Sequence, residues 1–149
     1  MITQGICTSF LSELPQGIHN FTTTTGDIFK CALYTQSASL NNTTTAYTTT
    51  GEITGTAYVA GGFAWTAAQN ITPQAIGNTA FWSWSVNPTW AAATFNNPVA
   101  GGLIYNSSKA NRAVAVFAFP EVMIVQNRLF TFPLPANQSS TAVLQIQVS

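Results

Sequence analysis

Residues 101–119, GGLIYNSSKANRAVAVFAF, contain the clearest unit of secondary structure in this 149-residue chain. A β-prone run at 103–105 and an apolar run at 113–119 flank a stretch with turn-forming side chains, and this succession predicts a β-hairpin. Both faces of the second arm are apolar, so we expect it to be a central strand covered on both sides. Gly101 and Gly102 predict a bulge or a close backbone approach where the chain enters the sheet.

Outward from this hairpin, short apolar runs separated by turn signals continue along the chain at intervals of about 8 to 12 residues. Further strands are predicted at 28–34, 52–60, 63–66, 80–86, 90–95, 99–105, 129–134 and 142–149. This spacing favours a single mainly-β domain over residues 1–149, with the architecture of an antiparallel β-sandwich or barrel.

Two of these strands have a clear inward face. In the strand at 28–34, we expect the core face to carry Phe29, Cys31 and Leu33. In the last strand, the inward positions are Ala142, Leu144, Ile146 and Val148.

One short helix is expected near the N-terminus. Ile6, Phe10 and Leu14 recur at the spacing of an amphipathic helix over 3–14, within a helical segment at 1–17. Pro15 and Gly17 would end it. A helix this short is marginal alone, so we expect its apolar side to dock on the sheet or on a neighbouring subunit.

The stretch at 35–51 is rich in threonine and is too polar to form core by itself. We expect a surface excursion with Leu40 and Tyr47 as its anchors. A solvated loop and a contact loop are both compatible with this composition. If the loop makes contacts, its candidate interaction residues are Thr43, Thr44, Thr45 and Tyr47.

Three local signals predict how strands connect. Gly61 and Gly62 predict a tight turn that joins 52–60 to 63–66 as a second hairpin. Residues 66–79, which include a proline and a glycine, predict a connection. Pro120 predicts a sheet boundary directly after the 113–119 strand.

Large aromatic residues allow two interpretations. An exposed platform of rings would stack on sugars, whereas rings packed between sheets would fill the core. The alternation of Trp82 and Trp84 with serine favours the core for those two. Candidate residues for a platform or a subunit interface are Phe63, Trp65 and Trp90.

Charged residues make up only 5% of the chain, and the formal net charge is zero. Ordinary soluble domains have about 25% charged residues. The few basic residues are scattered, which argues against a nucleic-acid groove. Residues 54–108 are uncharged, but they are interrupted too often for a transmembrane helix, and we expect no membrane partner. Weak charge repulsion suits a subunit of an assembly.

The supply of reactive side chains predicts a protein that is not an enzyme. His19 is the single histidine, and no motif fixes it beside Asp27 and a serine as a catalytic set. We expect His19 to be a partly buried cap at the helix exit. Cys7 and Cys31 do not form a metal motif with it and should be small buried hydrophobes, so neither a metal nor a cofactor is predicted.

Several short stretches carry a resemblance to a known family. They are CTSF at 7–10, FKCALYT at 29–35, TTAY at 44–47, GTAY at 55–58, GG at 61–62 and LIYN at 103–106. In this order, the chain resembles a family of small virion structural proteins of tailed bacteriophages.

The resemblance implies a head decoration, or cement, protein on the capsid surface of the virion, made in the host cytoplasm. Its expected partners are the major capsid protein and further copies of itself. A tail, fibre or adaptor component is the near alternative. A carbohydrate-binding β module that takes a glycan is an alternative from another class.

Overall fold

The computed structural model describes residues 1–147 and confirms a mainly-β, sandwich-like fold with antiparallel sheets and one short α-helix near the N-terminus. The helices are α1 (Thr8–Glu13) and the 3-10 helix η1 (Ala67–Gln69). The strands are β1 (Gly5–Ile6), β2 (Phe29–Tyr34), β3 (Gly55–Thr56), β4 (Phe63–Ala64), β5 (Gln74–Ile76), β6 (Thr79–Trp82), β7 (Thr89–Phe95), β8 (Val99–Asn106), β9 (Arg112–Met123), β10 (Arg128–Thr131) and β11 (Leu144–Gln147).

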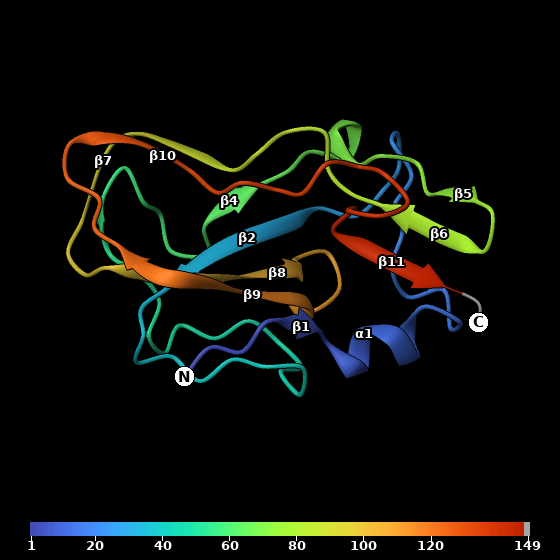
Figure 1. Ribbon diagram of the computed structural model, residues 1–149, viewed down its shortest axis with the longest axis horizontal. Helices are drawn as coiled ribbons and strands as arrows, with labels where there is room; N and C mark the ends of the chain where they lie inside the picture. The colour runs from blue at the N-terminus through green and yellow to red at the C-terminus, as the bar shows by residue number, and fades with distance from the viewer. Residues whose placement is uncertain (148–149) are drawn as a thin grey trace.

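The main sheet has the strand order β1-β9-β8-β2-β4 and runs across the middle of the molecule (Figure 1). The predicted hairpin is present as β8 and β9, which pair antiparallel. All residues of β8 are buried. In β9, which we expected to be covered on both sides, burial is complete for Ala113–Val116 and is then lost towards Met123.

Gly101 and Gly102 confirm the close approach that their sequence position predicts. A Cβ atom on Gly101 would lie 2.2 Å from the carbonyl oxygen of Phe117, and one on Gly102 would lie 2.8 Å from Cε2 of Phe132. The register between β8 and β9 also shifts between Val99 and Gly101. Glycine therefore allows the neighbouring strand and the Phe132 ring to pack against β8.

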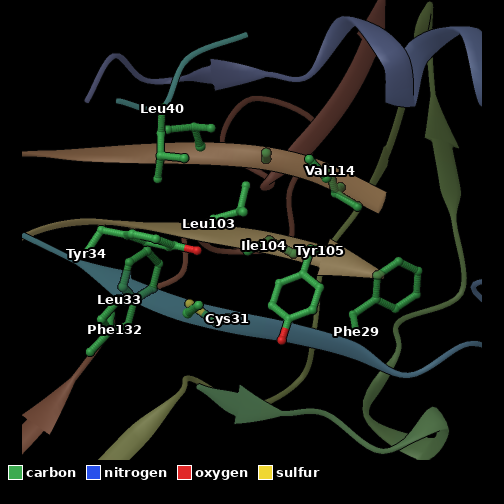
Figure 2. Close-up of a cluster of buried hydrophobic side chains, with 14 of the residues drawn as sticks. Phe29, Cys31, Leu33, Tyr34, Leu40, Leu103, Ile104, Tyr105, Val114 and Phe132 are labelled. Carbon is green, nitrogen blue, oxygen red and sulfur yellow. The ribbon is translucent and has the colours of Figure 1, made fainter. Parts of the chain in front are cut away.

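Both faces of β2 are covered. Phe29, Cys31 and Leu33 are buried as expected, and Figure 2 shows them in the same cluster as Phe132. Ala32 and Tyr34, on the opposite face, are also buried. The cover on that second face is the threonine-rich excursion, because the Tyr34 hydroxyl donates to the carbonyl oxygen of Thr48 at 2.6 Å.

The excursion at 35–51 follows the surface, but its anchors belong to the core. Leu40 is buried, and its backbone exchanges hydrogen bonds with Met1 and Thr3. The Tyr47 ring stacks on Tyr105 with centroids 4.7 Å apart. This polar segment therefore contributes two side chains, Leu40 and Tyr47, to the packing against the main sheet.

Two smaller sheets, β10-β7-β3 and β11-β6-β5, contribute further residues to the core. Trp82 and Trp84 are buried, which confirms core filling for these two rings. Trp84 stacks on Trp65 at 4.7 Å and meets Phe29 edge-on at 5.4 Å. Aromatic rings thus join the β6 region to the main sheet.

The predicted hairpin at Gly61–Gly62 is wrong. β3 pairs with β7, whereas β4 pairs with β2. The reason lies at Gly62, which has a φ of +76° and would place a Cβ atom 2.0 Å from the carbonyl oxygen of Cys31. This residue brings the chain against the backbone of β2, so the two flanking segments enter different sheets.

The N-terminal helix is shorter than predicted. Gly5 and Ile6 pair with Val116 and Ala115 as β1, and α1 begins only at Thr8. Glycine weakens a helix interior by about 1 kcal/mol relative to alanine. Since the edge of β9 offers hydrogen bonds to this segment, strand pairing replaces the first part of the helix.

Pro120 does not end the sheet, because β9 continues to Met123. The pairs Gly101↔Ala118 and Val99↔Met123 leave residues 119–122 opposite a single residue of β8. A bulge of this kind tolerates proline, because its missing N–H is not needed for the ladder.

Further details of the predicted strands and connections differ from the structure. Residues 66–79, predicted as a connection, contain η1 and β5. The strand predicted at 129–134 is β10 and ends at Thr131. In β11, Leu144 is buried but Ile146 is exposed, because β11 is an edge strand of a small sheet. The predictions for Val148 and Ser149 lie outside the described residues.

Candidate functional site

The predicted interaction residues of the threonine-rich excursion lie on the surface, except for Tyr47. Thr43 and Thr45 are exposed and Thr44 is half-buried. The Thr45 carbonyl oxygen accepts the N–H of Ala113, so the backbone of this stretch is held against β9. The half-buried Tyr47 donates its hydroxyl to Glu52 at 2.6 Å. The threonines are accessible to a partner, and their binding role stays a prediction.

The aromatic candidates come together, but inside the molecule. Phe63 meets Trp65 edge-on at 5.7 Å and Trp90 edge-on at 6.3 Å. Trp65 is buried and its indole N–H donates to the Val86 carbonyl oxygen at 2.7 Å. Trp90 is also buried, and Phe63 is half-buried. These rings fill the space between sheets, so the exposed platform is corrected to a core cluster.

A buried polar network lies beside the C-terminal end of α1. Nε2 of His19 lies 2.7 Å from Glu13 Oε2, and its Nδ1 lies 2.9 Å from Asn106 Nδ2. Asn106 Nδ2 also donates to Asp27 Oδ2 at 2.7 Å, while its Oδ1 accepts the N–H of Ser108 at 3.0 Å. These partners fix the orientation of the Asn106 amide, because a carboxylate accepts and an N–H donates. His19 therefore accepts at Nδ1 and donates to Glu13 through Nε2.

This network holds three parts of the chain together. Both ring nitrogens of His19 are occupied, and its side chain has no exposed surface. The two carboxylates also pair outward, Glu13 with Arg112 and Asp27 with Lys109 at 3.8 Å. The arrangement joins the helix exit, the 19–27 loop and the β8–β9 turn, and it brings together residues up to 99 positions apart.

A second polar cluster holds the segment before β4. Glu52 accepts the hydroxyls of Tyr47 at 2.6 Å and Tyr58 at 2.7 Å, and the N–H of Gly61 at 2.7 Å. Tyr105 donates to the Gly61 carbonyl oxygen at 2.9 Å. Burial, together with the nearby Glu52 carboxylate, raises the pKa of Tyr105 to about 12. These tyrosines are therefore neutral donors over the physiological range.

The cysteines confirm their predicted role as small buried hydrophobes. Cys7 and Cys31 are both free and fully buried. Burial, with a smaller contribution from Glu13, raises the pKa of the Cys7 thiol to about 11. Burial also raises the pKa of the Cys31 thiol. Neither is poised as a nucleophile.

Sequence reasoning missed the most exposed apolar part of the chain, residues 121–129, which we call the β9–β10 segment. Val122, Ile124 and Leu129 are exposed there, with exposed fractions of 45%, 64% and 63%. Val125, the buried residue of this segment, anchors it through its carbonyl oxygen, which accepts the N–H of Phe95. The sequence signal is an apolar run flanked by a single acid and a single base.

A hollow of about 700 Å³ adjoins this segment. Its walls include Ile2, Phe119, Glu121 and Val122. It lies where the N-terminal segment leaves β9, since β1 pairs with β9 only at Ala115 and Val116. On the side away from β8, the second half of β9 therefore has no strand partner among the described residues.

The charges of this segment are also unpaired. Among residues 1–147, neither Glu121 nor Arg128 forms a salt bridge. The Arg128 guanidinium donates to the carbonyl oxygen of Ile124. The candidate functional site is therefore an interaction surface with an apolar centre, one acid and one base, and neither charge has a salt-bridge partner within residues 1–147.

Two kinds of feature were not found in the described part of the chain: a cluster of metal ligands and a membrane-spanning helix. No group of three or more His, Cys, Asp or Glu residues could hold a metal ion within residues 1–147. In the same residues, every helix is too short to cross a membrane. Comparisons with protein-family models, curated protein sequences and solved structures gave no match.

Proposed function

We propose that this chain is a structural protein of a tailed-bacteriophage virion, and that it decorates the capsid by binding across neighbouring major capsid subunits. The observation that carries the proposal is the exposed apolar surface of the β9–β10 segment beside a hollow, which is typical of a subunit that works within an assembly. Exposed apolar surface of this kind typically marks a protein–protein contact. The resemblance of the sequence to small phage virion proteins supplies the partner.

The mode of binding follows from the scarcity of charge. With 5% charged residues and zero net charge, the protein has little long-range field to steer a partner. Affinity would come from apolar burial, from hydrogen bonds to open strand edges such as β5 and β11, and from repeated engagement around capsid symmetry axes. The expected complex depends weakly on salt.

A tail, fibre or adaptor role remains the near alternative within the virion. It would require far fewer copies than a decoration role. The glycan-binding alternative has lost its main support, because Trp65 and Trp90 are buried.

The proposal is tested by washing purified virions of the encoding phage in high salt and assaying the chain in the pelleted particles by mass spectrometry. A neutral crowding agent at matched viscosity is the control. We expect the chain to pellet with the particles under both conditions. Its absence from washed particles would contradict a virion role, and its selective release by salt would contradict the apolar binding mode.

A further inference from the structure

We propose that the β9–β10 segment is a self-association surface, on which two copies of this chain pack about a two-fold axis. The partner is a second copy because this surface combines a projection, a hollow and two opposite charges that form no salt bridge within the described residues. The inference deepens the proposed function, and its place in a virion rests on that proposal. Self-association itself is measurable on the isolated protein.

The projection, which we call the tip, is the connection between β9 and β10 at residues 124–127 together with the first two residues of β10. Ile124 is exposed over 64% of its surface and Leu129 over 63%. Figure 1 shows this connection at one end of the molecule, beyond the arrowhead of β9. The tip is held firmly from beneath, because Val125 is buried, and the N–H of Asn127 donates to Thr94 Oγ1 at 2.8 Å. A supported apolar tip loses little conformational entropy when it is buried by a partner.

The receiving site is the 700 Å³ hollow that adjoins the same segment. The apolar residues Ile2, Phe119 and Val122 are among those that line it. The hollow is large enough for one or two aliphatic side chains. Because projection and hollow are neighbours on one molecule, a two-fold rotation can place each tip in the hollow of the other copy.

Charge complementarity favours the same arrangement. Glu121 lines the hollow, whereas Arg128 belongs to the tip. In the two-fold contact, Arg128 of each copy approaches Glu121 of the other, which gives two identical ion pairs at the rim of an apolar centre. Rim charges of this kind chiefly set register and partner choice.

The test is analytical ultracentrifugation of the full chain from micromolar to submillimolar concentration. Wild type is expected to shift from the mass of one copy to that of two as concentration rises. Ile124→Asp should weaken the association roughly tenfold or more, because it places a carboxylate in the apolar contact. The matched control is Ile76→Asp, since Ile76 is 61% exposed in β5 at the opposite end of Figure 1 and should leave association unchanged.

Charge exchange tests the two-fold geometry directly. Glu121→Arg and Arg128→Glu should each weaken association, because each creates a pair of like charges. The double variant should recover most of the lost affinity. Circular dichroism melts establish that every variant is folded.

Three results would overturn the inference. They are a wild-type chain that stays monomeric throughout the concentration range, equal effects of Ile124→Asp and Ile76→Asp, and a double charge variant no better than the single ones. Failure of the proposed function is a separate result: a dimer that uses this surface but is absent from virions would retain the inference and remove the function.

Discussion

Asn106 Nδ2 lies 2.9 Å from His19 Nδ1, although the two residues are 87 positions apart in the sequence. Asn106 is fully buried. Its Nδ2 also donates to Asp27 Oδ2, and its Oδ1 accepts the N–H of Ser108. One amide thereby ties the loop after α1 to the end of β8. Four of the eight charged side chains of the sequence, those of Glu13, Asp27, Lys109 and Arg112, form ion pairs around this site.

Replacing Asn106 with alanine should destabilise the fold by about 2–4 kcal/mol, because buried polar groups of His19 and Asp27 would lose their partner. The measurement is urea unfolding followed by tryptophan fluorescence. Asn97→Ala is the control, since Asn97 is exposed, and it should change stability by less than about 0.5 kcal/mol. Equal stabilities of the two variants would show that the network contributes nothing.

Glu52→Gln should destabilise the segment before β4 by about 1–3 kcal/mol, because an amide cannot accept all three donors that meet the carboxylate. Limited proteolysis should then cut the 35–62 region faster than in wild type. Glu121→Gln, at an exposed acid, should change neither property in dilute solution. Unchanged proteolysis of Glu52→Gln would contradict the anchoring role of this cluster.

Gly62→Ala should be more damaging than Gly77→Ala. Both glycines have positive φ, at +76° and +59°, so both substitutions incur the backbone cost of about 1–2 kcal/mol. Only at position 62 would the Cβ atom of the introduced alanine press against the Cys31 carbonyl oxygen, whereas a Cβ atom at position 77 would face open space. Overpacking should add about 1–3 kcal/mol. Equal unfolding midpoints would refute the close contact between this residue and β2.

Stability should fall in alkaline solution. Burial raises the pKa of Cys7 from 9.0 to about 11 and that of Tyr105 from 10.0 to about 12. As pH rises above 9, the unfolded chain loses these protons before the folded chain does. The corresponding stability is fully present below pH 9 and is lost as pH rises through about 11 and then about 12.

The measurement is the free energy of unfolding as a function of pH, with Cys7→Ala as the comparison. This variant should show a shallower decline between pH 9 and about 11. A wild-type free energy that stays constant over that interval would contradict the burial of these groups.

Local sequence signals predicted the elements whose pairing is also local. The β8–β9 hairpin, the core face of β2 and the close approach at Gly101 and Gly102 all follow from alternation and turn chemistry. The hairpin predicted at Gly61–Gly62 is wrong because the flanking strands β3 and β4 pair with β7 and β2, which are distant in the sequence. Glycine pairs signal a change of direction, but they do not specify which strand the chain meets next.

The interaction surface was harder to predict, because exposure is a property of the whole fold. Trp65 and Ile124 are both large apolar residues, yet the first is buried and the second is exposed. The large aromatic rings gave the stronger signal in the sequence, but in the structure they pack in the core. Residues 121–129 gave a weaker signal, since an apolar run next to a turn is equally typical of a buried strand.

The proposed role as a capsid decoration protein is tested most directly by the copy number of this chain relative to the major capsid protein, determined by quantitative mass spectrometry of purified virions. We predict that the two copy numbers are of the same order. A chain present in only a few copies per particle would place it in the tail or a fibre, and its complete absence would contradict a virion role.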